Sequence, residues 1–294
     1  MVASRRKRKI NVECKVLTAL SFYATVSYQK PVGMSYLHGL CQASVSNAVK
    51  EVTMALNKYN ILKKYIHFPG TRPERQAIIN GFSNKYGFPG CDLMSYAGPQ
   101  NMRKDFLIEN ITIPGMFKYD LNIINIDASF GGATHDVHIW KNSQISQHLQ
   151  ELHNRGEAVW LLGDSGYPLR PWLLTPIVNA EPGSAYEHYT NMHCLTRNTV
   201  ERCIGVLKAR WRCLLAHRVL HYNHHKKIFL HNICNRHRLP VPQLPSSDIL
   251  EDQNNQIPQQ PLQGVGVGAQ QQLLASGRQQ RDFIVQRLWS APRP

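Results

Sequence analysis

A mixed α/β (α+β) fold is predicted by three observations on the 294-residue sequence. Strand-like and helix-like segments alternate over residues 66–240, which is typical of such domains. Residues 12–65 show only the helical spacing of apolar side chains. Residues 241–294 are rich in Gln, Pro and Gly, and such a composition buries too little apolar surface to order itself, although the end of this segment, DFIVQRLW, could form a short docking helix. We therefore expect a basic arm over residues 1–11, a small helical region, an α/β domain and a disordered tail.

Composition excludes several classes of protein. Hydrophobic residues make up 43% of the chain and charged residues 18%, as in soluble globular proteins. The sequence contains no run of 18 apolar residues and no apolar stretch behind its basic start, so we expect neither a transmembrane helix nor a secretory signal. Seven scattered cysteines indicate reduced thiols rather than a disulfide scaffold. We expect a nuclear protein, with a cytoplasmic share.

The charge indicates a polyanionic partner. Thirty-four Lys and Arg residues against 19 Asp and Glu residues give a net charge of +15. Phosphate contacts and counterion release favour such a surface, which points to nucleic acid. A run of five cations near the N-terminus is typical of a nuclear import signal or a phosphate-contacting arm, although a solvated, frayed terminus also has this composition. These residues are Arg5, Arg6, Lys7, Arg8 and Lys9.

The region 12–65 reads as short helices separated by a tight turn. The first helix has apolar residues at helical spacing, namely Val16, Leu17, Leu20 and Ala24. Residues 30–33, with a Pro and a Gly, predict a chain break. A second periodic stretch, which Ser44 or Ser46 would cap, runs through Val45, Ala48, Val49, Val52 and Leu56. Such helices suit either a helix-turn-helix-like unit or a plain helical subdomain that packs on the rest.

The α/β region contains two clear strand candidates and two clear helix candidates. Residues 121–127 are β-branched and aliphatic, and residues 158–163 form a second apolar run. Residues 134–153 read as a helix between them, and a longer helix is expected around 194–215.

Two carboxylates stand at positions suited to metal chemistry. Asp164 directly follows the second apolar strand, and side chains at such strand ends face ligand crevices. Glu201 lies on the long helix. With a third carboxylate, the two could hold two divalent ions for phosphodiester cleavage, and hard oxygen ligands suit Mg²⁺ or Mn²⁺. The structural alternatives are a turn or cap role for Asp164 and an intrahelical ion pair with a neighbouring Arg for Glu201.

Other chemistries lack a sequence signal. The chain has no Walker loop, no G-x-S-x-G and no dinucleotide fingerprint, so nucleotide hydrolysis and serine hydrolase chemistry find no support. Late histidines, among them His231, lie near cysteines in the sequence. However, their spacing matches no zinc template.

Four segments resemble the PIF/Harbinger transposases and the nucleases derived from them. They are IDASFGGATHD, LGDSGYPL, RNTVER with the following GVLKARWRCL, and LHNIC, within roughly residues 85–236. Residues 12–57 resemble the helical region that precedes the nuclease in that family. The resemblance implies an RNase H-like nuclease domain and an Asp-Asp-Glu triad that binds two divalent ions and hydrolyses DNA phosphodiester bonds. It also implies a separate Myb-like DNA-binding partner protein.

The resemblance assigns the catalytic and metal-binding positions residue by residue. Asp164 corresponds to the second acidic position and Glu201 to the third. The first falls in a stretch where this chain has FPGCDLMSYAGP, with Asp92 as its sole acidic residue. The flanks match the family, but about five residues of the strand are missing, or about 16 Å at a rise of 3.3 Å per residue. Asp92 either takes the first position on a shortened strand, or that position is lost.

Two functions follow for this chain. The first is a metal-dependent DNA nuclease impaired by the shortened motif; the alternative is a catalytically inactive domesticated transposase that acts as a DNA-binding or protein-interaction module. Three cations on or near the helix of Glu201 would contact phosphates, since Arg suits bidentate phosphate contact, although a solvated helix face has the same pattern. They are Lys208, Arg210 and Arg212.

Overall fold

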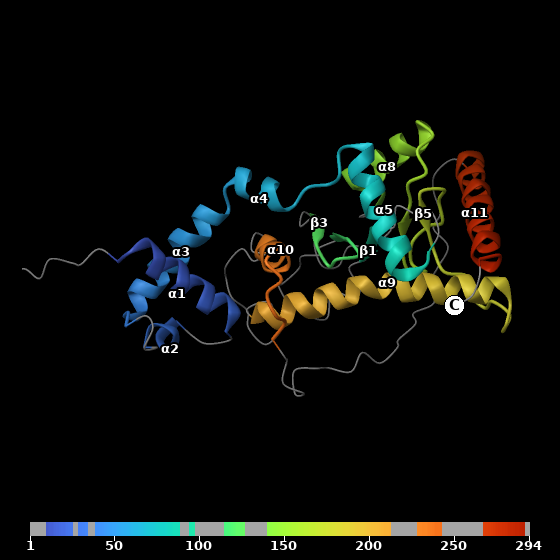
Figure 1. Cartoon of the computed structure of the whole chain (residues 1–294). Helices are drawn as coiled ribbons and strands as arrows, with labels where there is room; N and C mark the ends of the chain where they lie inside the picture. Colours follow the sequence, from blue (N-terminus) through green and yellow to red (C-terminus); the bar gives the residue numbers. More distant parts are fainter. Residues whose placement is uncertain are drawn as a thin grey trace, which may run out of the picture.

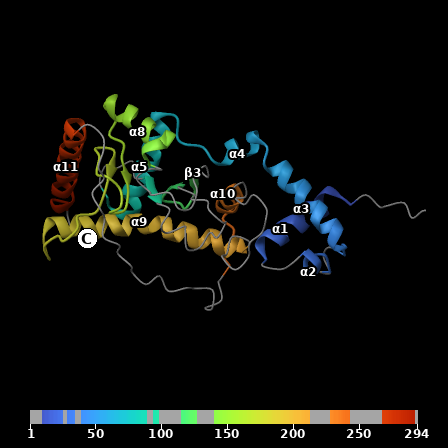
Figure 2. The same cartoon turned by 180° about the vertical axis from the view of Figure 1, so that it is seen from behind.

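The fold is an elongated arrangement of helices around one small sheet. The computed structural model describes residues 10–25, 29–34, 39–88, 94–97, 115–126, 140–212, 228–242 and 267–291. The N-terminal helices lie at one end and the C-terminal helix α11 (Val267–Trp289) at the other, as Figures 1 and 2 show from opposite sides. The long helix α9 (Ala185–Arg210) runs along the molecule between them. The Arg5–Lys9 arm lies outside the described residues.

The sheet combines antiparallel and parallel pairing. Its five strands are ordered β3-β2-β1-β4-β5, so the first strand in sequence is the central one. Pairing is antiparallel between β1 and β2 and between β2 and β3, and parallel between β1 and β4 and between β4 and β5. The strands are β1 (Met94–Ala97), β2 (Gly115–Phe117), β3 (Ile123–Ile126), β4 (Leu161–Leu162) and β5 (Leu173–Leu174). The mixed α/β prediction is confirmed at this level.

Both parallel strands at the β4–β5 edge are buried on two faces, which explains their unbroken apolar sequence. Leu161 and Leu173 pack with β2, β3 and α8 (Gln144–Asn154) on one face. Leu162 and Leu174 pack with α5 (Arg72–Tyr86), α9 and α11 on the other. The strand predicted over 158–163 is therefore present but pairs only at its centre, and the one predicted over 121–127 pairs over Ile123–Ile126.

The described residues of the N-terminal region form four helices: α1 (Val12–Ala24), α2 (Gln29–Met34), α3 (Gln42–Leu56) and α4 (Tyr59–Tyr65). The buried face of α3 is the predicted one, with Val45, Ala48, Val49 and Val52. In α1 the prediction is partly wrong. Leu20 and Ala24 pack against the core, but Val16 and Leu17 are exposed, and the side chains of Thr18, Ala19, Phe22 and Tyr23 fill the buried face.

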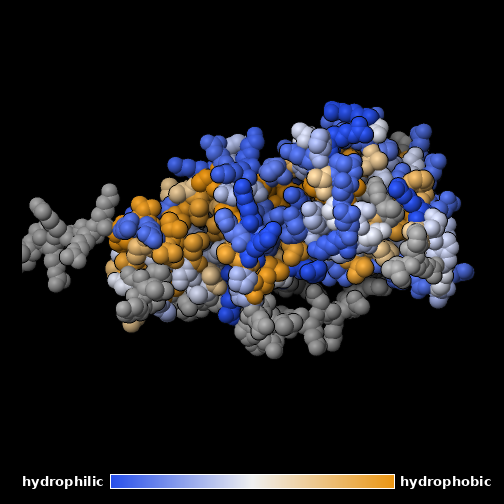
Figure 3. Space-filling view, viewed as in Figure 1, coloured by the Kyte–Doolittle hydropathy of each residue, from blue (hydrophilic) through white to orange (hydrophobic). Residues whose placement is uncertain are grey.

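Two further predictions for this region are wrong. Residues 30–33 do not break the chain but lie inside α2, because Pro is tolerated in a first helical turn, where its missing N–H has no intrahelical partner. The N-cap of α3 is Cys41 rather than Ser44 or Ser46. Ser44 instead makes a 3.3 Å hydrogen bond with the Cys41 sulfur. Apolar side chains remain gathered on the surface over the N-terminal helices (Figure 3).

One hydrophobic cluster joins the N-terminal helices to the rest of the molecule. It includes Phe22 of α1 and Val49 of α3, together with Phe117 of the sheet, Leu207 of α9 and Phe229 of α10 (Phe229–Arg236). The N-terminal helices therefore pack on α9 and α10 rather than forming a separate core.

The helices of the α/β region begin at clear capping signals. Thr71 and Glu74 form a capping box at the start of α5, and Ser143 caps α8 by accepting the N–H of Ser146. The helix expected over 134–153 is described from residue 140, with a short turn before α8; residues 134–139 lie outside the described part. The long helix α9 starts after Ser184, well before the predicted residue 194, and ends at Arg210.

The prediction of a disordered tail is wrong for residues 267–291. There α11 packs against α9 and β5 and buries Ile284, Val285 and Leu288. Gly277 makes this contact close, since a Cβ there would lie 3.1 Å from the Leu169 side chain and from the Arg170 backbone. Residues 243–266 lie outside the described part. Among the helices described, none is sufficiently long and apolar to cross a membrane.

Candidate active site

Asp164 lies where the chain leaves β4. Gly163 donates its N–H to the Leu174 carbonyl at 2.8 Å, which holds this strand end against β5. A Cβ at Gly163 would lie 3.1–3.3 Å from the Leu173 and Tyr167 side chains, so a larger residue would require these neighbours to shift. One Asp164 oxygen, Oδ1, accepts the Gly166 N–H at 2.8 Å and closes an Asx turn. The predicted turn role is thus present, and it leaves Oδ2 facing α9.

Glu201 is presented by α9, and the sheet fixes that helix in place. The Nε2 of His193 lies 3.2 Å from the Leu174 carbonyl, and the Tyr189 hydroxyl donates to the Thr175 carbonyl at 3.2 Å. These bonds tie α9 to the last residue of β5 and to the residue that follows it. Glu201 follows His193 by about two turns and leaves its carboxylate half exposed. The loop after β4 and the middle of α9 are thereby brought to the same edge of the sheet.

Arg197 joins the two carboxylates, which we call the acidic pair. Its Nη2 lies 3.5 Å from Asp164 Oδ2, and its Nη1 lies 3.7 Å from Glu201 Oε1. The intrahelical ion pair considered for Glu201 is therefore present, but the same guanidinium also reaches Asp164. This role of Arg197 was not predicted from the sequence. A weak signal existed, because Arg197 stands four residues before Glu201 on a helix.

The third predicted acidic residue, Asp92, lies outside the described residues. The central strand β1, Met94–Ala97, contains no acidic residue. It runs parallel to β4 with Ser95 opposite Leu162, so its C-terminal end points to the edge at which Asp164 lies. Among the described residues, no three His, Cys, Asp or Glu side chains gather closely enough to hold a metal ion. The described part of the site is thus a pair of carboxylates and one cation.

The three predicted cations of α9 differ in exposure. Lys208 and Arg212 are partly exposed, whereas Arg210 is buried. Arg210 donates to the Asn235 side chain at 2.5 Å and to the Leu239 carbonyl at 2.7 Å, which ties α9 to the end of α10. The Nη donors of Arg210 are thus used inside the protein, and its predicted contact with DNA stays a prediction.

A second polar cluster lies under the C-terminal half of α9, and we call it the carbonyl clamp. Its members are Cys203, His231, Asn232 and Asn235. The His231 ring, the Asn235 amide and the Cys203 thiol lie 2.8, 2.9 and 3.0 Å from the Leu121 carbonyl oxygen. Leu121 has a φ of 65°, a strained value for a non-glycine residue that these donors help to hold.

Asn232 completes the clamp by acting as a strand neighbour for β3. Its Oδ1 accepts the Ile123 N–H at 2.8 Å and its Nδ2 donates to the Ile123 carbonyl at 2.6 Å. The same Nδ2 donates to the Tyr65 carbonyl at 2.7 Å, which links the end of α4 to the sheet. The LHNIC segment therefore holds the fold together.

Burial shifts the titration of two histidines that contact α9 or belong to it. Desolvation lowers the pKa of His231 to about 4, against the opposing effect of the Leu121 carbonyl. The pKa of His193 is likewise lowered to about 3, chiefly by desolvation and also by the nearby charges of Arg197 and Arg281, against the opposing effect of the Leu174 carbonyl. Burial raises the pKa of the Cys203 thiol well above its usual value, which keeps the thiol protonated as a donor. All three groups are neutral at physiological pH.

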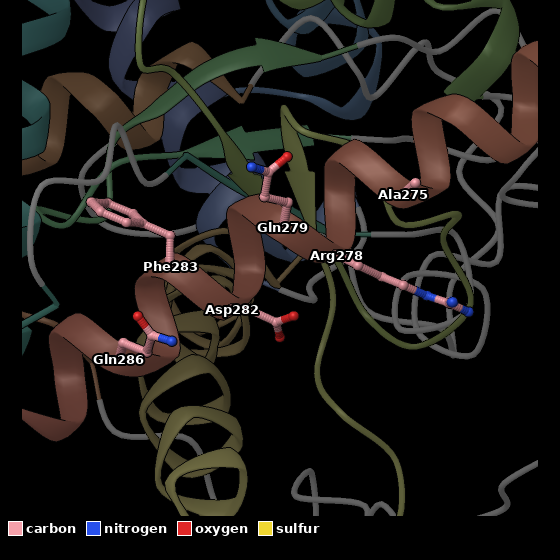
Figure 4. Close-up of a pocket in the computed structure, with 6 residues that line it drawn as sticks. All are labelled: Ala275, Arg278, Gln279, Asp282, Phe283 and Gln286. Atoms are coloured by element: carbon pink, nitrogen blue, oxygen red, sulfur yellow. The ribbon is translucent and has the colours of Figure 1, made fainter.

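A surface pocket lies elsewhere, on α11. Figure 4 shows its six lining side chains, which spread along one helix instead of converging on a point. They are Ala275, Arg278, Gln279, Asp282, Phe283 and Gln286. None belongs to the acidic pair, so this pocket and the candidate site are different features.

The comparisons with known proteins agree with this geometry. Residues 111–235 match the family model described as a DDE superfamily endonuclease. The chain is similar to the protein named "Putative nuclease HARBI1" in three animals. Identity is 30% in Bos taurus, over 81% of this chain and 71% of the relative. Identity to the Xenopus laevis protein is 27%, over 92% of this chain and 81% of the relative. Identity to the Homo sapiens protein is also 27%, over 84% of this chain and 74% of the relative.

No solved structure matches the chain. The relatives nevertheless cover most of it, and the matched region contains both members of the acidic pair and the carbonyl clamp. The chain belongs to the harbinger transposase-derived nucleases of the DDE superfamily.

Proposed function

We propose that this protein hydrolyses DNA phosphodiester bonds with divalent metal ions held by Asp164 and Glu201. Asp92 would supply the third ligand from outside the described residues. The observation that carries the proposal is the convergence of two carboxylates, from separate motifs, on one guanidinium. This cation supports the proposal, because both carboxylates attract the same positive charge. The carboxylate oxygens of Asp and Glu are hard ligands, which suit Mg²⁺ or Mn²⁺.

The chain's own residues would orient and bind the substrate. Divalent ions, when bound, activate the attacking water and stabilise the leaving oxygen. Asp164 is held by its Asx turn and Glu201 by the anchored helix, so both carboxylates are positioned before a ligand arrives. Lys208, about two turns beyond Glu201 on α9, and Arg212, just after the end of that helix, would contact backbone phosphates. An RNase H-like reading of the domain is supported by the mixed sheet, in which an antiparallel meander continues into parallel strands.

Three further parts of the proposal concern the surroundings of this site. The Arg5–Lys9 run would serve in nuclear import and as an arm on DNA, and the protein would then be nuclear with a cytoplasmic share. The helices α1–α4 would act as a helix-turn-helix-like unit. A Myb-like DNA-binding protein would be the partner, as the family resemblance implies. Fractionation of cells and pull-down of the full chain with such a partner test these points.

Nicking of supercoiled plasmid by the full-length chain tests the proposal. Mn²⁺ or Mg²⁺ should support nicking and EDTA should abolish it. Asp164→Asn and Glu201→Gln should each reduce nicking by at least about a hundredfold, since each removes a charged metal ligand. Glu181→Gln, an exposed acidic residue in the loop before α9, is the matched control and should leave nicking unchanged. Nicking that survives both site variants would refute the assignment.

An inactive DNA-binding module is the second candidate, and one observation favours it. The strand β1 that leads toward Asp164 carries no carboxylate. DNA binding without metal-dependent nicking would support this candidate. If the shortened motif is the defect, reinsertion of the roughly five missing residues of the first-motif strand should raise nicking. Unchanged nicking in that insertion variant would show that the shortened motif is not the cause.

A further inference from the structure

We propose that Arg197 is a displaceable internal counter-ion of the acidic pair. Its guanidinium neutralises Asp164 and Glu201 in the metal-free protein, and a divalent ion entering the pair displaces it. Arg197 is thus a positioning residue that competes with the metal ion. This inference rests on the proposed function, because it requires the pair to accept a divalent ion.

The position between the carboxylates needs positive charge. Two carboxylates that approach each other repel, and the repulsion disfavours their shared ionised state. One guanidinium contacts both, with different nitrogens toward Asp164 at 3.5 Å and Glu201 at 3.7 Å. The pair and Arg197 together still have a net charge of −1, so a divalent cation remains attracted to them.

The guanidinium is held loosely. Both distances exceed the roughly 2.7–2.9 Å of a charge-assisted hydrogen bond. The Nε of Arg197 is buried without a hydrogen-bond partner among the described residues. An Arg placed four residues before a Glu is also the less favourable order on a helix. Charge attraction, rather than a set of directed bonds, therefore keeps Arg197 in place.

Another arginine of the same chain shows what a permanent ion pair looks like. Arg75 donates to Glu157 three times, at 2.6, 2.8 and 3.1 Å. It also donates to the carbonyls of Pro69 and Gly70 at 3.2 and 3.1 Å. Its side chain is only 5% exposed. Arg75 thus has directed partners for all its nitrogens, and Arg197 does not.

The pair is accessible to an ion from solution. The Arg197 side chain is 14% exposed, whereas those of Asp164 and Glu201 are 26% and 54% exposed. The carboxylates therefore lie nearer to the solvent than the cation that bridges them. A metal ion can reach their outer oxygens without unfolding the site, after which the guanidinium loses its partners and moves away.

Calorimetric titration of the full-length chain with Mn²⁺ tests this inference. Arg197→Gln should bind Mn²⁺ about three- to tenfold tighter than the wild type, because two weak ion pairs no longer compete. Arg197→Lys should lie between the two, since one ammonium cannot span both carboxylates. Arg202→Gln removes an exposed arginine from the same helix and should change the affinity less than twofold. Without metal, Arg197→Gln should melt at a lower temperature, and Mn²⁺ should raise its melting temperature more than that of the wild type.

The outcomes separate the inference from the proposed function. If Mn²⁺ binds the wild type through Asp164 and Glu201, but Arg197→Gln binds it equally or more weakly, the inference is overturned and the proposed function stands. If Mn²⁺ binds neither the wild type nor Arg197→Gln, the inference and the proposed function are both overturned. If Arg197→Gln fails to fold, the Mn²⁺ affinity of Arg197→Lys tests the inference instead. An Arg197→Lys variant that binds Mn²⁺ no more tightly than the wild type overturns the inference. In the Asp164→Asn background, the gain from Arg197→Gln should shrink.

Discussion

The acidic pair and the carbonyl clamp both pack against α9, yet they are built in opposite ways. The clamp is mostly buried and meets backbone groups at 2.6–3.0 Å. The acidic pair is partly exposed, and ion pairs of 3.5 and 3.7 Å hold it. Buried polar groups with short, directed bonds stabilise a fold, whereas accessible charges with loose partners are free to bind a ligand. Both clusters lie in segments that resemble family motifs, so a motif match by itself does not separate structural residues from functional ones.

The largest effect is expected at Asn232. Asn232→Ala should lower the free energy of unfolding by roughly 3 kcal/mol, because it leaves the Ile123 N–H and two carbonyls without their partner. Urea denaturation measures this change. Asn191→Ala on the exposed face of α9 is the control and should cost less than about 0.5 kcal/mol. A loss below about 1 kcal/mol at Asn232 would show that the clamp is not a main support of the fold.

The second effect is a pH dependence that originates in the clamp. The folded-state pKa of His231, about 4, lies below the ordinary value of 6.5, so the unfolded chain binds more protons between these values. The contribution of His231 is fully present above pH 6.5 and is lost as the pH falls toward 4. At pH 5 the loss relative to pH 8 should be about 2 kcal/mol.

His231→Gln should remove this part of the pH dependence. Urea denaturation at pH 8 and at pH 5 would give a smaller difference for the variant than for the wild type. His237→Gln, an exposed histidine after α10, is the control and should keep the wild-type difference. Equal differences for His231→Gln and the wild type would contradict the burial argument.

The third prediction separates two neighbouring cations of α9. Arg210→Gln should lower the free energy of unfolding by about 1–2 kcal/mol, because Asn235 and the Leu239 carbonyl lose a charged donor. Lys208→Gln should change it by less than about 0.5 kcal/mol, since Lys208 is partly exposed. Thermal or urea unfolding of the two variants measures the difference. Similar losses for both would mean that Arg210 is no more structural than Lys208.

The smallest expected effect concerns DNA. If about six phosphates are contacted, the logarithm of the binding constant should fall with that of the salt concentration with a slope near −5. Lys208→Gln should weaken binding about two- to fivefold and reduce the slope by about one. Arg210→Gln should leave the slope unchanged, because its donors are used inside the protein. Fluorescence anisotropy with a labelled DNA duplex at several salt concentrations measures the binding constants and this slope. A slope near zero would refute DNA binding through phosphates.

Several features of the fold could be predicted from sequence. The apolar face of α3 and the strand at Leu161–Leu162 follow from local patterns. The early start of α9 has a local signal too, because Ser184 and Glu187 have the spacing of a helix N-terminal cap. The helix α11 was harder to find, since averaging the composition of residues 241–294 hides Ile284, Val285 and Leu288. These side chains order the helix only by packing on α9 and β5.

The sequence by itself determined that Asp164 follows a buried strand and that Glu201 stands on a long helix. It also carried the motifs that indicate the family. Only the tertiary structure decided that these carboxylates share the guanidinium of Arg197, that Arg210 faces inward and that Asn232 pairs with the edge of β3. The reason is that strand and helix signals depend on neighbours along the chain. The partner of a charge or an amide depends on which segments distant in sequence pack together, as when His193 ties α9 to the end of β5.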